Sequence, residues 1–239
     1  MINISKQLKR AGNLVYRIKR WPYIKTDSDK YNLHRYGNNY GGFMVYDEDL
    51  KKSPHPIIYS FGIGEDLSFS EDLMNAFSPE IYAFDPTPKA IHFVKNHELS
   101  KNSSFHFSPI GLSDKDESKT FFIKPEGAKD VSGSVIPRKN LMKEGIEVNM
   151  ECIKTISKKN GHTYIDLLKM DVEGSEFKVV EGLKECDVAI NQICLELHDR
   201  FFNDGIKRLK ELLATMRSMG YILISVSGRK DELTFLRKG

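Results

Sequence analysis

Three apolar segments of the chain each run into a short turn that carries glycine or carboxylate side chains. They cover residues 57–66, 82–86 and 164–176. Each segment has the pattern of a buried strand followed by a polar turn. The carboxyl ends of parallel strands lie along one edge of an open α/β sheet, and ligands of such sheets bind along that edge. The pattern therefore predicts a polar rim with a small-molecule site.

Strands and helices are expected to alternate from residue 56 onward. We expect sheet strands at 57–61, 81–84, 105–107, 164–170 and 190–197, with further strands at 120–123 and 146–152 around an irregular loop. The expected helices cover 67–77, 87–99, 153–159, 175–184 and 205–219. Alternating βα units predict a parallel sheet with right-handed crossovers. A closing hairpin, 221–227 and 232–237, would add one antiparallel strand to it.

The 239 residues suit one large domain, expected at 51–239, preceded by a separate lead-in, 1–50. Residues 5–20 have apolar positions at helical spacing, and basic residues without any acid lie between Lys6 and Lys25. Such a helix can lie on an anionic membrane, bind an acidic partner or pack on its own domain. Residues 26–50 are polar, aromatic and rich in glycine, which predicts a loop that acts as a lid over the rim or as a plain connector.

Composition excludes several classes of protein. A net charge of +3 does not by itself indicate nucleic-acid binding, and we expect no nucleic-acid partner. No apolar run approaches the roughly 20 residues that span a bilayer, and the first residues lack the features of a secretory signal. The three cysteines form no CxxC pair, which suits a reducing compartment and a cytoplasmic location. GxSxG and HExxH motifs are absent, which argues against common hydrolase chemistry.

The first turn carries Gly62 and Gly64, and Asp85 follows Gly64 by 21 residues at the end of the next strand. A carboxylate at that position can accept the hydroxyls of an adenosine ribose. The glycines alone are a weak signal, since tight strand-to-helix turns often need glycine for steric reasons.

The charge of this turn favours one class of adenosine cofactor. A dinucleotide fingerprint would have a third glycine where this chain has Leu67. Glu65 and Asp66 would also repel a pyrophosphate placed against the following helix. S-adenosylmethionine carries no phosphate but has a sulfonium and an ammonium group, which acidic neighbours stabilise. The turn therefore favours S-adenosylmethionine.

A second acidic set follows the later strands. Asp171 and Glu173 flank one residue and are expected to project to the same side, while Glu196 and His198 repeat that spacing. One acid would face the methionine end of the cofactor and another the acceptor. Alternatively, the first pair caps the next helix, and His198 is an ordinary hydrogen-bonded histidine. The four side chains could also hold a divalent cation. The primary expectation is that the site holds no metal.

The sequence resembles FkbM-type methyltransferases, a branch of the class I S-adenosylmethionine-dependent enzymes, over residues 56–239. The resemblance is strongest at 166–176 (DLLKMDVEGSE), and a looser likeness to a methyltransferase-like subgroup lies at 35–45. Supporting matches are FGIG at 61–64, FDPTP at 84–88, IGLSD at 110–114 and LELH at 195–198. It implies a Rossmann-like three-layer α/β sandwich with a seven-stranded, mostly parallel sheet and an antiparallel C-terminal strand.

The resemblance also implies a set of cofactor-binding residues. Gly62 and Gly64 would approach the methionine moiety, with Glu65 supplying the acid that many class I enzymes carry at the position of Ser60. Asp85 would hold the ribose, and Asp171 would line the methyl-donor pocket. The full implied cofactor set is Phe61, Gly62, Gly64, Glu65, Asp85, Pro86, Thr87, Ile110, Gly111, Leu112 and Asp171.

The expected reaction is an in-line transfer of a methyl group to an oxygen nucleophile, with His198 as the first candidate base, Glu173 as the second and Asp171 beside them. By family analogy, the acceptor is a hydroxyl of a glycan, a lipid-linked sugar or a small metabolite. The alternatives are a non-catalytic adenosine-binding or membrane-associated module and an NAD-type oxidoreductase. An amino-methyltransferase of nucleic acids would show Asn/Asp-Pro-Pro-Tyr/Phe where this chain has residues 171–174.

Overall fold

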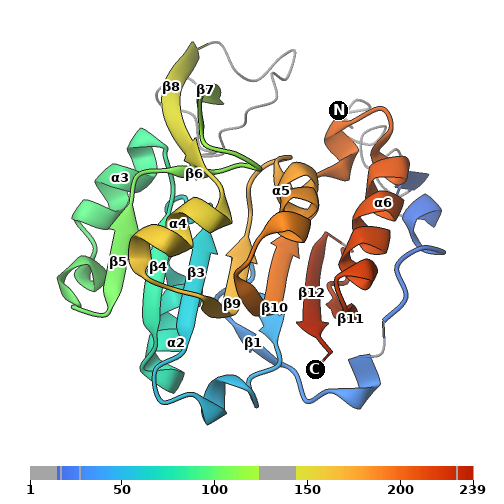
Figure 1. The fold of residues 1–239 in the computed structure, drawn as a ribbon, viewed down its shortest axis with the longest axis horizontal. Helices are drawn as coiled ribbons and strands as arrows, with labels where there is room; N and C mark the ends of the chain where they lie inside the picture. Colours follow the sequence, from blue (N-terminus) through green and yellow to red (C-terminus); the bar gives the residue numbers. More distant parts are fainter. Residues whose placement is uncertain (1–14, 17, 27, 124–143, 230, 239) are drawn as a thin grey trace, which may run out of the picture.

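A central sheet with helices on both faces forms the body of the computed structural model (Figure 1). The structure describes residues 15–16, 18–26, 28–123, 144–229 and 231–238. Within these residues the main sheet has seven strands. In spatial order they are β11 (Tyr221–Val226), β12 (Glu232–Arg237), β10 (Ala189–Glu196), β9 (Tyr164–Met170), β3 (Ile57–Phe61), β4 (Glu80–Phe84) and β5 (Phe105–Ser108).

The sheet is parallel except for one strand, as the sequence predicts. β3 pairs in parallel with β4 and β9, and β9 pairs in parallel with β10. β12 is antiparallel to both of its neighbours, β10 and β11. Because β3, β4, β9 and β10 point the same way, the turns that follow them meet at one edge. This topology confirms the expected class I methyltransferase fold.

Alternating side chains divide the core between the two faces of the sheet. Tyr59 and Phe61 of β3 pack on the face that carries helices α4, α5 and α6, whereas Ile58 packs on the opposite face with α2 and α3. The helices are α2 (Ser68–Phe77), α3 (Pro88–Lys95), α4 (Ile153–Asn160), α5 (Glu176–Gly182) and α6 (Gly205–Ser218). All lie close to their predicted positions. Thr87 caps α3 as expected, since its hydroxyl accepts a hydrogen bond from Ala90 N at 3.4 Å.

The lead-in before the sheet contains more structure than its composition indicates. The prediction of a loop over 26–50 was wrong in part, because β1 (His34–Tyr36) and β2 (Phe43–Val45) pair there as a hairpin. Three-residue 3-10 turns lie at η1 (Ser28–Lys30) and η2 (Leu50–Lys52). Phe43 and Val45 are buried in the core on the α2 face. The short strand β2 therefore packs against the sheet through these two apolar side chains.

One predicted helix is shorter than expected. The predicted helix 87–99 ends at Lys95 and is followed by the 3-10 helix η3 (Glu98–Lys101). The strands expected at 120–123 and 146–152 are confirmed. They are β7 (Glu117–Ile123) and β8 (Glu144–Glu151), which form a separate three-stranded sheet with β6 (Gly111–Leu112). Two further 3-10 turns, η4 (Leu183–Glu185) and η5 (Asp199–Phe201), follow α5 and β10. The loop 124–143 lies outside the described residues.

The basic segment at the start of the chain packs on the domain through one arginine. Residues 15–16 and 18–20 are helical, and the rest of the predicted helix 5–20 lies outside the described residues. Arg20 is buried and pairs with Asp199 at 3.2 Å and Asp231 at 2.7 Å. Val15, Ile18 and Trp21 are exposed. Among the described residues, no helix has the length and apolar character needed to cross a membrane.

Candidate active site

The glycine turn after β3 is shaped by close contact with the turn after β9. Gly62 has a φ of +71°, and a Cβ atom there would collide with the carbonyl oxygen of Asp171. Backbone hydrogen bonds hold the same corner, from Gly62 N to Phe84 O at 2.9 Å and from Asp171 N to Phe61 O at 3.1 Å. Glycine is thus required at position 62 both for its conformation and for the close approach of Asp171.

A buried lysine on the neighbouring strand supports this corner. Lys169 lies in β9, and its ammonium group donates to the carbonyl oxygens of Gly62 at 2.7 Å and Phe61 at 3.2 Å. Its side chain is almost fully buried. The last carbonyls of β3 are therefore fixed by a charged donor. A lysine inside a mostly apolar strand was a signal that sequence reasoning missed.

Asp85, the expected ribose ligand, joins the glycine turn to the start of α3. One carboxylate oxygen accepts a hydrogen bond from Gly64 N at 2.9 Å, and the other accepts from Thr87 N at 2.9 Å and from the Thr87 hydroxyl at 2.6 Å. Burial raises the pKa of Asp85 although these hydrogen bonds oppose the shift. We call Gly62, Gly64, Asp85 and Thr87 the glycine half of the rim. All its polar groups named here are hydrogen-bonded.

A cavity opens at the rim and brings together almost all of the predicted cofactor residues. Its lining includes Phe61, Gly62, Gly64, Asp85, Pro86, Thr87, Ile110, Gly111, Leu112 and Asp171, with Glu173 beside them. Glu65 alone among the predicted cofactor residues does not line it, and its side chain is exposed. Asp66 is also used elsewhere, since it accepts hydrogen bonds from Asn38 Nδ2 at 2.8 Å and Ser68 N at 2.9 Å.

Three lining residues come from segments that carry no recognisable motif. Tyr40 belongs to the lead-in hairpin, and Phe121 and Met150 belong to β7 and β8 of the small sheet. The lead-in therefore places Tyr40 at the cavity, and its role as a lid stays a prediction. Asn38 holds this loop to the glycine turn through Asp66. Only the tertiary structure brings these segments together.

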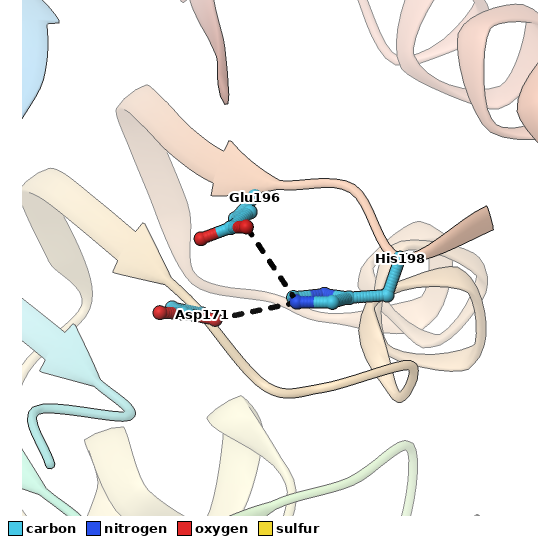
Figure 2. A group of neighbouring side chains, drawn as sticks. All are labelled: Asp171, Glu196 and His198. Atoms are coloured by element: carbon cyan, nitrogen blue, oxygen red, sulfur yellow. Dashed lines mark ion pairs between the residues drawn. The ribbon is translucent and has the colours of Figure 1, made fainter. Parts of the chain in front are cut away.

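The turns after β9 and β10 form a second, acidic half of the rim, made of Asp171, Glu173, Glu196 and His198. His198 Nε2 lies 3.8 Å from Asp171 Oδ1, 3.8 Å from Glu173 Oε2 and 3.7 Å from Glu196 Oε1. Figure 2 shows Asp171 and Glu196 approaching the imidazole from two neighbouring strands. Asp171 and Glu173 project to the same side, as the sequence predicts. Glu196 and His198 do not line the cavity itself.

The charges of this half shift the pKa values of its members. Burial alone would lower the pKa of His198, but Glu176, Asp171 and Glu173 outweigh burial and raise the pKa to about 9. Burial, followed by the charge of Asp171, raises the pKa of Glu196 to about 7. The imidazole therefore carries a proton at neutral pH in this arrangement, which does not suit it as a general base there.

Glu176 ties the two acidic turns together, and sequence reasoning missed it. Its carboxyl group is fully buried and accepts hydrogen bonds from Gly174 N at 2.8 Å and from His198 N at 2.6 Å. Glu173 has a φ of +49° in this turn, and Gly174 has a φ of +106°. An acid in the first turn of a helix is common for electrostatic reasons, so its position alone did not reveal this contact. In α5, neither Asp171 nor Glu173 is the N-cap residue, which is Ser175.

The fold and the rim define a class I methyltransferase domain, and comparison with known families agrees. The model of the methyltransferase FkbM domain matches residues 59–223. The match includes the strands β3, β4, β9 and β10 and both halves of the rim. The chain belongs to the FkbM methyltransferase family.

Individual relatives are more distant. The chain is 30% identical over 143 residues to a human protein described as probable methyltransferase-like protein 24. That alignment covers 59% of this chain and 32% of the relative, so the chain matches about a third of the relative's length.

Solved structures with a similar fold have low sequence identity. Fibrillarin from Aeropyrum pernix, in complex with S-adenosyl-L-methionine, has a TM-score of 0.43 and 10% identity over 86% of this chain and 82% of that one. The N-terminal domain of human METTL16, in complex with SAH, has a TM-score of 0.42 and 12% identity over 77% and 61%.

Proposed function

We propose that the protein transfers the methyl group of S-adenosylmethionine to a hydroxyl oxygen of a glycan or small metabolite. The observation that supports this most is the composition of the cavity, which has the glycine half of the rim on one side and Asp171 with Glu173 on the other. The glycine half suits an uncharged adenosine. The acidic side suits the sulfonium and ammonium groups of the methionine part, since opposite charges attract strongly where water is excluded.

The proposed reaction is an in-line displacement. The acceptor oxygen forms a bond to the methyl carbon as the bond from that carbon to sulfur breaks. The electron pair stays on sulfur, which becomes a neutral thioether. Positioning of the two reactants can lower the barrier by up to about 7–11 kcal/mol. The chain would contribute by holding the adenosine at the glycine half and the methionine part beside Asp171, with the acceptor next to Glu173.

Glu173 is the proposed acceptor of the hydroxyl proton. It lines the cavity, whereas His198 does not and has a raised pKa. This assignment reverses the order expected from sequence, in which His198 came first. The reason is that four carboxylates surround His198 and raise its pKa. The sequence spacing revealed three of these acids but not Glu176, which lies outside the two spaced pairs.

The test is methyl transfer from radiolabelled S-adenosylmethionine to a panel of sugars, glycans and hydroxyl metabolites. We expect the wild-type protein to label at least one acceptor. The Glu173→Gln variant should label it about 10²–10⁴-fold more slowly while still binding the cofactor. Glu98→Gln, at an exposed surface position, should keep the wild-type rate. Full turnover by Glu173→Gln would contradict the role of Glu173, and absence of both cofactor binding and labelling in the wild type would contradict the proposed function.

A further inference from the structure

Three potential metal ligands converge at the acidic half of the rim. One carboxylate oxygen of Asp171, one of Glu196 and a ring nitrogen of His198 all lie within 4.8 Å of one another. In Figure 2 the two carboxyl groups lie on either side of the same edge of the imidazole. Asp171 follows β9, and Glu196 ends the neighbouring strand β10. Adjacent strands of a rigid sheet therefore hold two of the three groups.

These groups approach one another without forming hydrogen bonds. The distances of 3.7 and 3.8 Å from His198 Nε2 to Glu196 Oε1 and Asp171 Oδ1 exceed hydrogen-bond length. His198 is only 2% exposed. Among the described residues, buried Asp171 Oδ1 has no hydrogen-bond partner, and neither has buried His198 Nδ1. Buried polar atoms without partners are rare in folded proteins, and an ion bound beside Asp171 would give its Oδ1 a partner.

We propose that Asp171, Glu196 and His198 bind a divalent transition-metal cation. Ligands of an octahedral ion with bonds of 2.0–2.1 Å are separated by roughly 3.0 Å when adjacent and roughly 4.2 Å when opposite. The observed separations of 3.7 and 3.8 Å are longer than the adjacent distance and shorter than the opposite one, so the side chains would have to move by less than about 1 Å to bind one ion as adjacent ligands. Two carboxylates with one imidazole suit ions such as Mn²⁺ or Zn²⁺ better than Ca²⁺, which prefers oxygen ligands only.

Glu176 has the position of an outer support for this site. Its carboxyl group accepts the hydrogen bond from His198 N, and its Oε1 lies 3.6 Å from His198 Nδ1. Ligating histidines usually donate their second ring nitrogen to a carboxylate or carbonyl, which orients the ring. A small movement of the ring would form that bond and turn Nε2 toward Asp171 and Glu196. Glu176 is therefore a positioning residue and not a ligand.

The site adjoins the cavity through Asp171, which belongs to both. A cation with three protein ligands keeps open positions, and a hydroxyl bound at one of them becomes more acidic. In the proposed function, that hydroxyl would be the methyl acceptor, with Glu173 beside it to take the proton. This role depends on the proposed function, but binding of the cation does not.

Binding is tested with Mn²⁺ on the chelator-treated protein of 239 residues, by calorimetry and by electron paramagnetic resonance of free Mn²⁺. We expect one saturable site in the wild type. Asp171→Asn and Glu196→Gln should each weaken Mn²⁺ binding by at least the ~10–100-fold that loss of an outer-shell partner causes. Glu80→Gln is the matched control, because Glu80 pairs directly with His106 at 2.8 Å without a third ligand. It should bind Mn²⁺ like the wild type.

Circular dichroism and thermal unfolding of each variant separate loss of binding from loss of folding. Lack of a saturable Mn²⁺ site in the folded wild type would overturn the inference, as would unchanged binding in folded Glu196→Gln. A parallel titration with S-adenosylhomocysteine keeps the two proposals apart. Nucleoside binding without Mn²⁺ binding would overturn only the metal site, and Mn²⁺ binding without nucleoside binding would overturn only the proposed function.

Discussion

The two halves of the rim are built from the same kind of strand ends but differ in how their polar groups are satisfied. In the glycine half, Asp85 accepts three hydrogen bonds, and Lys169 fixes the carbonyl of Gly62. In the acidic half, carboxylates surround His198 at 3.7–3.8 Å without hydrogen bonds to its Nε2. The first half is held by hydrogen bonds, whereas the carboxylates of the second half approach the imidazole at the distance of an ion pair.

This difference separates a structural task from a chemical one. A completed hydrogen-bond network holds one shape, which suits the binding of a rigid nucleoside. Three partly buried carboxylates around one imidazole shift the pKa values of Glu196 and His198, and such shifts are concentrated at functional sites. Substitutions in the glycine half should therefore reduce stability, while substitutions in the acidic half should spare stability and change binding or turnover.

The largest effect is expected at the Gly62 corner. Gly62→Ala would place a methyl group against the carbonyl of Asp171 and would have to keep a φ of +71°. Strain of both kinds should lower the free energy of unfolding by about 3 kcal/mol or more. Gly161→Ala is the control, since Gly161 has a similar φ of +75° and no described atom lies within 4 Å of the added Cβ. It should lose only about 1 kcal/mol in urea unfolding. Equal losses in the two variants would contradict the close approach of the two turns.

The next largest effect is expected at Glu176, which joins the two acidic turns. Glu176→Gln keeps one acceptor oxygen but presents an amide donor to either Gly174 N or His198 N. One buried N–H group then has no acceptor, and the free energy of unfolding should fall by about 2–3 kcal/mol. Mn²⁺ affinity should fall as well. Wild-type stability would show that these two hydrogen bonds do not hold the turns together.

A smaller loss is expected at Asp85, and here the two halves can be compared directly. Asp85→Asn leaves either Gly64 N or Thr87 without an acceptor and should lower the free energy of unfolding by about 1–2 kcal/mol. Asp171→Asn, in the acidic half, should lower stability by less than Asp85→Asn does, because its buried Oδ1 has no hydrogen-bond partner among the described residues and only an ion pair of 3.8 Å with His198 is lost. Chemical unfolding of both variants measures the contrast, and a larger loss in Asp171→Asn would reverse our assignment of the halves.

The effect of Glu196→Gln on stability in metal-free buffer is expected to be small at about pH 5, where the replaced carboxyl group is protonated in the folded protein, and to grow as pH rises. The pKa of Glu196 in the folded protein is raised from 4.5 to about 7. The folded state therefore holds this proton more tightly than the unfolded state, and the contribution of Glu196 to stability declines as pH rises from 4.5 to about 7. The wild type should lose stability relative to Glu196→Gln across that range. Thermal unfolding of both proteins at about pH 5 and about pH 8, near the lower end of this range and above its upper end, measures the difference in stability between them. The same difference at both pH values would contradict the raised pKa.

Sequence was sufficient to predict the placement of residues that belong to a local pattern, although their roles stay predictions. Gly62, Asp85 and Asp171 follow recognisable strands, and the cavity brings them together. Sequence was insufficient for Tyr40, Phe121 and Met150, which reach the cavity from other parts of the chain, and for Glu176, whose two partners lie in different turns. It also assigned Glu65 to the cofactor, although the turn directs that side chain to solvent, because spacing does not fix the direction of a side chain in a turn.

The most direct test of the whole account is calorimetric titration of the wild-type protein with S-adenosylmethionine, S-adenosylhomocysteine and NAD. We predict one site that binds both S-adenosyl compounds and no measurable binding of NAD, whose pyrophosphate would approach the acidic half. Tight binding of NAD with no affinity for either S-adenosyl compound would contradict the account.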